Sequence, residues 1–226
     1  MAFAGFPDEA FQFYEQLGAD NTRAFWQAHK GEYQQHVRGP MDALLGELDG
    51  FGPFHVFRPY KDVRFAKDKT PYKDHIGAYG ESEGGAGHYV QLSATGMFVG
   101  SGYYDMATDQ LDRFRRCVDA DATGEEVVAL TAELERRGHT ITAMSSLKTA
   151  PRGYPKDHDR IALLRLKGLV ASREWSTAGW MRTRAVVKRV RDTWNEAADL
   201  NAWLDTHVGP STLAPDEDEL ARFGPL

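Results

Sequence analysis

The sequence contains a single cysteine, Cys117, among its 226 residues. An internal disulfide and a zinc site built from cysteines are therefore excluded, and a reducing compartment is consistent with the composition. No apolar run approaches the roughly 20 residues that span a membrane. The first twenty residues hold no lysine or arginine, which a secretory leader requires. We therefore expect a soluble, cytoplasmic protein without a membrane partner.

Sequence motifs that carry a known chemistry are also missing. The eight histidines are scattered, and none stands in an H-x-x-x-H or H-E-x-x-H arrangement, so no metal site is predicted. The chain has no G-x-S-x-G nucleophile turn and no glycine-rich phosphate loop of the nucleotide-binding folds. Cys117 is expected to be a small apolar residue inside a helix. The sequence indicates no cofactor, reaction or oligomeric state.

The composition is that of a folded protein, with 42% hydrophobic and 27% charged residues. The length suits one full core, and neither an internal repeat nor a dividing linker is visible. Acidic residues prevail from Glu196 onward. We expect one domain over 1–208 and an acidic tail over 209–226.

Apolar spacing predicts an α+β fold. In some segments apolar residues recur every three or four positions, which predicts helices, and Gly39-Pro40 and Gly138 are expected to end two of them. These segments alternate with others whose pattern predicts strands. Asp20 or Asn21 is expected to cap the second helix, and Thr123 with Glu126 to form a capping box. Helices are predicted at 8–18, 21–38, 41–48, 108–118, 123–137 and 177–207, and strands at 54–58, 60–65, 88–94, 97–104 and 166–171.

The hairpin over 88–104 has the strongest pattern and is expected at the centre of a largely antiparallel sheet. Alternating apolar residues flank the turn Thr95-Gly96. On its second strand Gly100 and Gly102 share a face, which leaves room for another group to approach closely.

Positive charge is concentrated in three segments although the net charge is −6. Residues 58–73 hold six basic residues and two acidic ones, and residues 148–167 repeat these numbers. Residues 182–191 hold five basic residues and no acid. The first two segments suggest a local anion site. The third is expected to be a solvated helix face that pairs with the acidic tail, with nucleic-acid binding as the alternative.

The stretch Arg58-Pro-Tyr-Lys-Asp-Val-Arg-Phe-Ala-Lys-Asp-Lys-Thr-Pro-Tyr-Lys73 resembles the signature of the DUF2461 family. The resemblance covers about residues 6–175 and implies a single α+β domain with no established activity. The chain departs from the family pattern at Lys61, a position where the family more often has arginine. Lysine keeps the positive charge but lacks the paired N–H donors with which a guanidinium binds an anion. Supporting matches are Asn21 with Arg23, Phe25 and Trp26, the segment Gly100–Tyr104, and Lys148–Tyr154 leading to Asp157-His158.

The first segment offers groups that suit phosphate or carboxylate. In an extended 60–65 strand, Asp62 and Arg64 would share the face opposite Val63 and Phe65. The alternative is a structural ion-pair network with Asp62, Asp68 and Asp74, and the resemblance favours a site. The predicted ligand-binding residues here are Arg58, Lys61, Arg64, Lys69, Tyr72 and Lys73.

The second segment adds Lys148 and Arg152 to the predicted ligand-binding residues. They stand in a loop with Pro151, Gly153 and Pro155, before a helix expected to start near Asp157. His158 is a candidate acid or base, but the favoured interpretation is that an aspartate caps the helix beside an exposed histidine.

We therefore expect the two segments to converge on a basic pocket for a small anionic ligand. If the protein is an enzyme, its arginines and lysines would stabilise developing charge, and Asp62, Asp68 or His158 would transfer protons. The alternative is a non-catalytic module that uses the same basic surface for a protein or a nucleic acid, the latter being disfavoured by the negative net charge.

Overall fold

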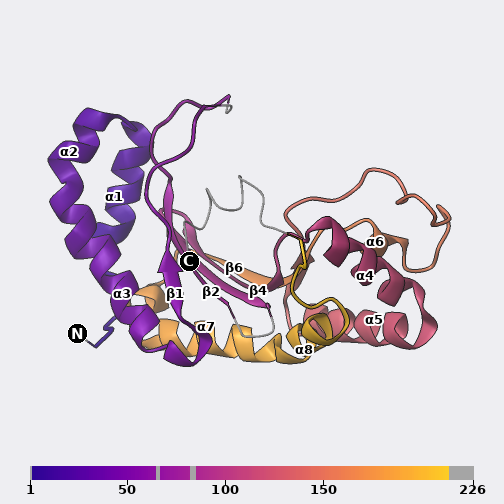
Figure 1. Ribbon diagram of the computed structural model, residues 1–226. Coiled ribbons are helices and arrows are strands. Elements are labelled where there is room, and N and C mark those ends of the chain that lie inside the picture. The colour runs from indigo at the N-terminus through magenta and orange to yellow at the C-terminus, as the bar shows by residue number, and fades with distance from the viewer. Residues whose placement is uncertain (1, 65–66, 82–84, 214–226) are drawn as a thin grey trace. The chain divides into compact units, whose positions relative to one another are not determined.

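The computed structural model describes residues 2–64, 67–81 and 85–213. Helices accompany a six-stranded sheet of order β1-β2-β3-β4-β6-β5, so the predicted α+β class is confirmed. Figure 1 shows the helices and strands of the chain. The predicted hairpin forms β3 and β4 in the middle of this order. The strands are β1 Phe54–Val56, β2 His75–Glu81, β3 Gly87–Ser93, β4 Gly96–Tyr103, β5 Thr140–Thr142 and β6 Leu169–Ser176.

Two compact units divide the chain, and both take residues from β3, β4 and β6. Unit 1 consists of Met1–Gly80, Tyr89–Val99 and Glu174–Asp192. Unit 2 consists of Glu81–His88, Gly100–Arg173 and Thr193–Leu226.

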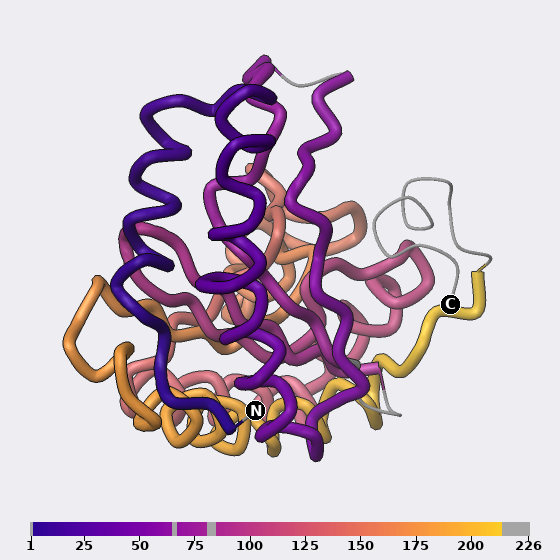
Figure 2. The backbone as a smooth tube through the Cα atoms, turned by 90° about the vertical axis from the view of Figure 1, so that its left-hand side faces the viewer, coloured from indigo at the N-terminus to yellow at the C-terminus, as the bar shows by residue number. Residues whose placement is uncertain are grey.

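Unit 1 begins with the helical segments drawn in indigo in Figure 2, and their aromatic side chains pack on one another. The Phe13 ring lies 5.9 Å from the Trp26 ring and 5.5 Å from the Tyr33 ring, in the edge-on and tilted geometries that aromatic pairs prefer. The elements are α1 Asp8–Ala19, α2 Arg23–Glu32, a π-helical segment Tyr33–Arg38, α3 Gly39–Gly46 and a 3-10 turn Asp49–Phe51.

The helix does not break at Gly39-Pro40, so this prediction is wrong. The Gly39 N–H donates to the Gln34 carbonyl five residues earlier, which is the wider π spacing. Pro40 stands in the first turn of α3, where its missing N–H is tolerated. The predicted cap was also wrong, because Thr22 caps α2 by accepting a bond of 3.2 Å from the Phe25 N–H.

The predicted strand over 60–65 does not form. Residues 61–64 are irregular and only Tyr60 pairs, through an isolated bridge to Tyr72, while 65–66 lie outside the described residues. Strand β2 was missed because glycines at 77 and 80 are poor strand formers. Gly77 is nevertheless required, since a Cβ there would lie 2.5 Å from the Tyr89 hydroxyl. The three-residue β5 was missed as well.

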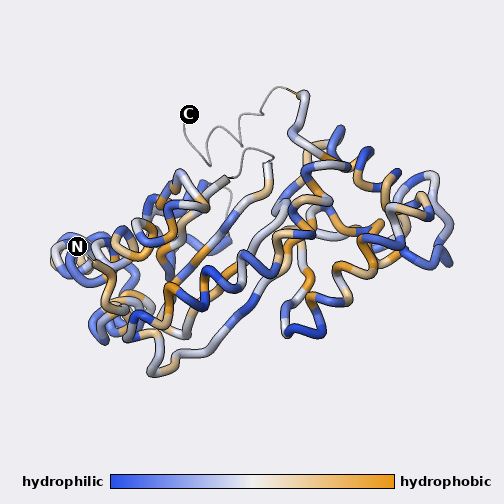
Figure 3. The backbone as a smooth tube through the Cα atoms, turned by 90° about the horizontal axis from the view of Figure 1, so that it is seen from below, coloured by the Kyte–Doolittle hydropathy of each residue, from blue (hydrophilic) through white to orange (hydrophobic). Residues whose placement is uncertain are grey.

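Unit 2 packs its helices around a core that includes Phe114 and Trp203. The helix α5 begins at Asp121 rather than Thr123, whose hydroxyl donates to the Cys117 carbonyl instead of capping. The helices of this unit are α4 Thr108–Asp119, α5 Asp121–Arg136, α6 Ile161–Leu164 and α8 Ala198–His207. Figure 3 shows apolar and polar residues alternating along the helical windings, as one-sided burial requires.

The single long helix predicted over 177–207 is three elements. A 3-10 turn Gly179–Arg182 precedes α7 Ala185–Glu196, and Ala197, with φ −83° and ψ 0°, separates α7 from α8. The room predicted beside Gly102 is filled by the chain itself. A Cβ at Gly102, where φ is +140°, would lie 2.1 Å from the Leu169 carbonyl oxygen of β6.

Candidate functional site

The predicted binding residues fall in different units. All those between Arg58 and Lys73 belong to unit 1, whereas Lys148, Arg152 and His158 belong to unit 2. Their convergence on one pocket stays a prediction, and the two groups are considered in turn.

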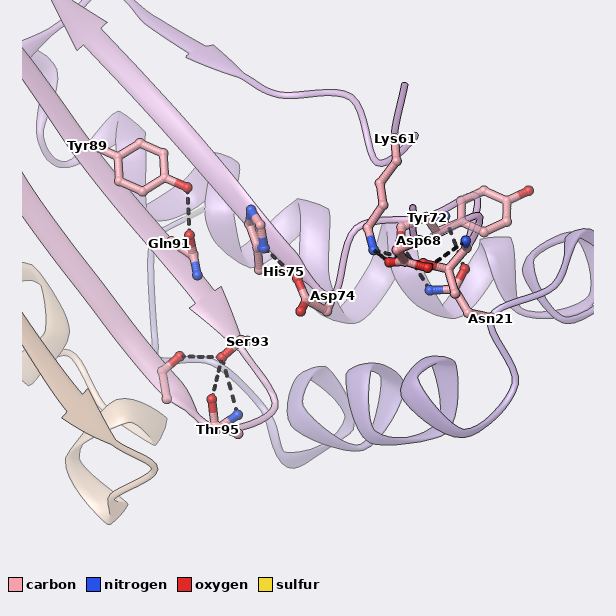
Figure 4. Close-up of polar contacts among 12 residues, drawn as sticks. Asn21, Lys61, Asp68, Tyr72, Asp74, His75, Tyr89, Gln91, Ser93 and Thr95 are labelled. Carbon is pink, nitrogen blue, oxygen red and sulfur yellow. Dashed lines mark hydrogen bonds and ion pairs between the residues drawn. The ribbon is translucent and has the colours of Figure 1, made fainter. Parts of the chain in front are cut away.

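Lys61 is held inside its own loop. Its Nζ donates to Asp68 Oδ2 and to Thr70 Oγ1, both at 2.8 Å (Figure 4). The bond from Lys61 and two bonds from Thr70 hold the pKa of the Asp68 carboxyl well below its usual range. Asp68 is therefore ionised near neutral pH and is not a proton donor there.

Arg64 is paired in the same manner. Its Nη2 lies 2.6 Å from Asp62 Oδ2, and its Nε donates to Asp62 Oδ1 at 3.0 Å. These bonds and the Arg64 N–H lower the pKa of Asp62 to about 2. Lys69 donates through Nζ to the Val63 carbonyl at 2.9 Å. Lys61 and Arg64 thus form ion pairs of the kind that the structural alternative described, whereas Lys69 bonds a backbone carbonyl of the same loop.

Tyr72 anchors this loop to the start of α2. Its ring is 2% exposed and stacks on the Trp26 ring at 4.5 Å and 12°. The Asn21 amide donates to the Tyr72 carbonyl and accepts from the Tyr72 N–H, each at 3.0 Å. Burial raises the pKa of the Tyr72 hydroxyl. The Asn21 of the family pattern therefore acts as a backbone clamp.

Arg58 and Lys73 differ from the other cations of the segment. Within residues 2–64, 67–81 and 85–213, no carboxylate forms an ion pair with either. The Lys73 Nζ lies 5.0 Å from the centroid of the Phe57 ring, a cation–π contact. Burial, and secondly the charge of Arg58, lower the pKa of Lys73. Arg58 and Lys73 are therefore neighbouring positive charges without an ion-pair partner in the described part of the chain, although the charge of Arg58 also contributes to the lowered pKa of Asp62.

The pairing of β1 with β2 becomes irregular at Arg58. The Phe57 N–H donates to the Gly77 carbonyl at 3.0 Å, and the Lys73 N–H donates to the Pro59 carbonyl at 2.8 Å. Three residues, 74–76, consequently stand opposite Arg58 alone. Such bulges redirect side chains and are frequent beside functional sites.

An aspartate and a histidine that the sequence analysis did not select stand at this bulge. His75 Nδ1 lies 2.7 Å from Asp74 Oδ1. Burial opposes ionisation of Asp74, but the bond to His75 outweighs it and the pKa of Asp74 is lowered. One feature of the sequence could have identified this pair: His75 follows an acid, Asp74, directly after the basic segment 58–73.

In unit 2, Lys148 and Arg152 are exposed on the predicted loop, and no ion pair joins either to another residue in the described part of the chain. His158 is half-buried, with Asp119 Oδ1 3.0 Å from Nε2 and the Arg160 N–H donating to Nδ1 at 2.9 Å. Both ring nitrogens are engaged, which leaves none open for proton transfer. The helix expected near Asp157 begins only at Ile161.

The third basic segment pairs with acids from elsewhere in unit 1. Arg182 bonds Asp8, Arg184 bonds Glu47, and Lys188 bonds Asp192. The expected acidic partners, at 216–219, lie outside the described residues. These contacts favour the solvated-face interpretation over a nucleic-acid surface.

A separate polar cluster is enclosed in unit 2. His88 is 8% exposed, and its Nδ1 lies 2.9 Å from the Ser101 hydroxyl, which also accepts a bond of 2.7 Å from the Asn201 amide. Burial lowers the pKa of His88 to about 4. Ser101 is itself buried, so the cluster serves packing between β3, β4 and α8 rather than chemistry on a ligand.

A groove of about 520 Å³ lies between α3 and β1 in unit 1. Arg38, Asp42 and His55 are among its lining residues, and none of the predicted ligand-binding residues lines it. The described residues contain no cluster of three or more side chains suited to hold a metal ion. None of the described helices combines the length and apolar character needed to cross a membrane.

Comparison with known proteins gives one match. A family model described as "Conserved hypothetical protein (DUF2461)" covers residues 9–203, most of the chain. No curated protein and no solved structure matched.

Proposed function

The chain belongs to the DUF2461 family, and from this premise we propose that Arg58 and Lys73 bind the anionic group of a small ligand. The observation that carries the proposal is their lack of an ion-pair partner among the described residues, while Lys61 and Arg64 have one. Two neighbouring cations repel each other, and a bound anion relieves that repulsion. Burial is the main cause of the lowered pKa of Lys73, and the repulsion by Arg58 is the second.

The two side chains suit a phosphate or a carboxylate in complementary ways. The planar guanidinium of Arg58 offers paired donors, and the Lys73 ammonium adds a point charge. Lys61, Arg64 and Lys69 support them indirectly, because their bonds to Asp68, Asp62 and the Val63 carbonyl fix the loop.

The test is calorimetric titration with inorganic phosphate and with citrate at low ionic strength. We expect Arg58→Ala and Lys73→Met each to weaken binding by about tenfold or more, the usual effect of losing a charged hydrogen bond. The matched control is Lys188→Ala, which also removes one positive charge but from the Asp192 pair on α7. Equal affinity in the wild type and in a folded Arg58→Ala/Lys73→Met double variant contradicts the proposal.

A second candidate, binding of single-stranded nucleic acid, is favoured by Tyr60. Its ring is 45% exposed directly after Arg58 and Pro59, and lies 5.2 Å from the Tyr72 ring. An exposed aromatic beside a cation can stack a base. Fluorescence anisotropy of a labelled oligonucleotide distinguishes the two, because Tyr60→Ala reduces binding only if bases stack there.

A further inference from the structure

His75 has one ring nitrogen engaged and one available. Its Nδ1 lies 2.7 Å from Asp74 Oδ1, and because a carboxylate only accepts, the ring proton resides on Nδ1. No other described residue forms a hydrogen bond with Nε2. The side chain is 27% exposed, so Nε2 carries a lone pair that a ligand can reach.

His75 and Lys73 reach the same face of the sheet. Phe57 stands opposite Gly77, and its ring lies 5.0 Å from the Lys73 Nζ. His75 precedes Gly77 by two residues of β2, which places both on one face. Diagonal neighbours on a sheet face are about 7–8 Å apart, within reach of one small ligand for long or aromatic side chains.

We infer that His75 is a third contact of the anion held by Arg58 and Lys73, that it takes up a proton as the ligand binds, and that the ligand group is a tetrahedral dianion such as a phosphate monoester. This inference rests on the proposed function. His75 then donates through Nε2 to the anion while Asp74 holds its Nδ1 proton.

Charge balance selects a dianion. With Arg58, Lys73 and the protonated His75 set against Asp74, the occupied site carries two positive charges in excess, which a single carboxylate leaves half compensated. The proton that His75 acquires comes from solvent, and no bond of the ligand is broken.

The ionisable groups around this site interact with Asp74, Lys73 or Arg58. Burial raises the pKa of Tyr14, the charges of Tyr33, Asp74 and Tyr89 raise it further, and the charge of Lys61 acts on Asp74. The charge of Arg58 acts on Lys73 and on Asp62. The strand register places His55 on the same sheet face as His75, and the His55 ring lies 5.5 Å from the Phe57 ring.

Sodium sulfate is the probe, because sulfate stays a dianion between pH 6 and 8 and does not itself titrate. At constant ionic strength we expect the wild-type dissociation constant to fall about tenfold from pH 8 to pH 6, as linkage to one imidazole proton predicts. Calorimetry in two buffers of different ionisation enthalpy should detect uptake of up to about one proton. Acetate should bind more weakly and with less proton uptake.

His75→Gln should remove both the pH dependence and the proton uptake. His55→Gln is the matched control and should keep the wild-type pH dependence. If Arg58→Ala weakens sulfate binding but the pH dependence persists in His75→Gln, or disappears in His55→Gln instead, the inference is wrong and the proposed function stands. If wild-type protein binds no sulfate, or Arg58→Ala binds it unchanged, both fail.

Discussion

Acid is expected to destabilise this protein through His88. The folded state holds its imidazole neutral in a buried cluster, where burial lowers the pKa to about 4, whereas an unfolded histidine titrates near 6.5. The unfolded state therefore binds the proton more readily. The stabilising contribution is complete above about pH 6.5 and is lost as the pH falls from there to about 4.

The difference between these two pKa values sets the magnitude. Each pKa unit corresponds to 1.36 kcal/mol, so the free energy of unfolding loses about 3 kcal/mol over this interval from His88 alone. That is a large fraction of the roughly 5–15 kcal/mol that keeps an ordinary domain folded.

Urea unfolding, followed by tryptophan fluorescence at pH 4 to 7, measures this loss in the wild type and in His88→Gln. The variant is expected to be less stable at pH 7, and its deficit should shrink by about 3 kcal/mol toward pH 4, because glutamine does not titrate. His36→Gln is the control and should leave the wild-type pH dependence intact. Parallel pH profiles for the wild type and His88→Gln refute the reasoning, as does an NMR titration that places the pKa of His88 above 6.

Other predictions concern the backbone contacts that shape the two units. Asn21→Ala should lower the free energy of unfolding by about 1–3 kcal/mol, because the buried Tyr72 N–H and carbonyl lose their partners, and urea unfolding measures the change. An unchanged midpoint contradicts the clamp. Gly102→Ala should destabilise by more than about 3 kcal/mol or prevent folding, because its Cβ would meet the Leu169 carbonyl oxygen at 2.1 Å. Gly138 also has a positive φ, but no atom lies within 4 Å of a Cβ built there. Gly138→Ala should therefore lower the free energy of unfolding, measured by thermal unfolding, by only about 1 kcal/mol. Equal losses at the two glycines exclude a steric role for Gly102.

The sequence did not predict which charged side chains between Arg58 and His75 form pairs. Asp74 is adjacent to Lys73, whereas Asp68 is seven residues from Lys61. Sequence distance alone would therefore favour a Lys73–Asp74 pair over a Lys61–Asp68 pair. The structure pairs Lys61 with Asp68 at 2.8 Å and gives Asp74 to His75 at 2.7 Å. Asp74 and His75 stand in the bulge between β1 and β2, which no local sequence pattern predicts.

The local periodicity of apolar residues specified the α+β class, the 88–104 hairpin and most helices. The composition of short segments specified where positive charge concentrates. These properties depend on neighbours within a few residues, so one chain segment is sufficient to determine them. Tertiary structure alone decided which cations form ion pairs, that β6 fills the space at Gly102, and that the Lys73 ammonium lies over the Phe57 ring. Ion pairs and close contacts depend on distances of a few ångströms between groups that are often far apart in sequence, and only the folded backbone sets those distances.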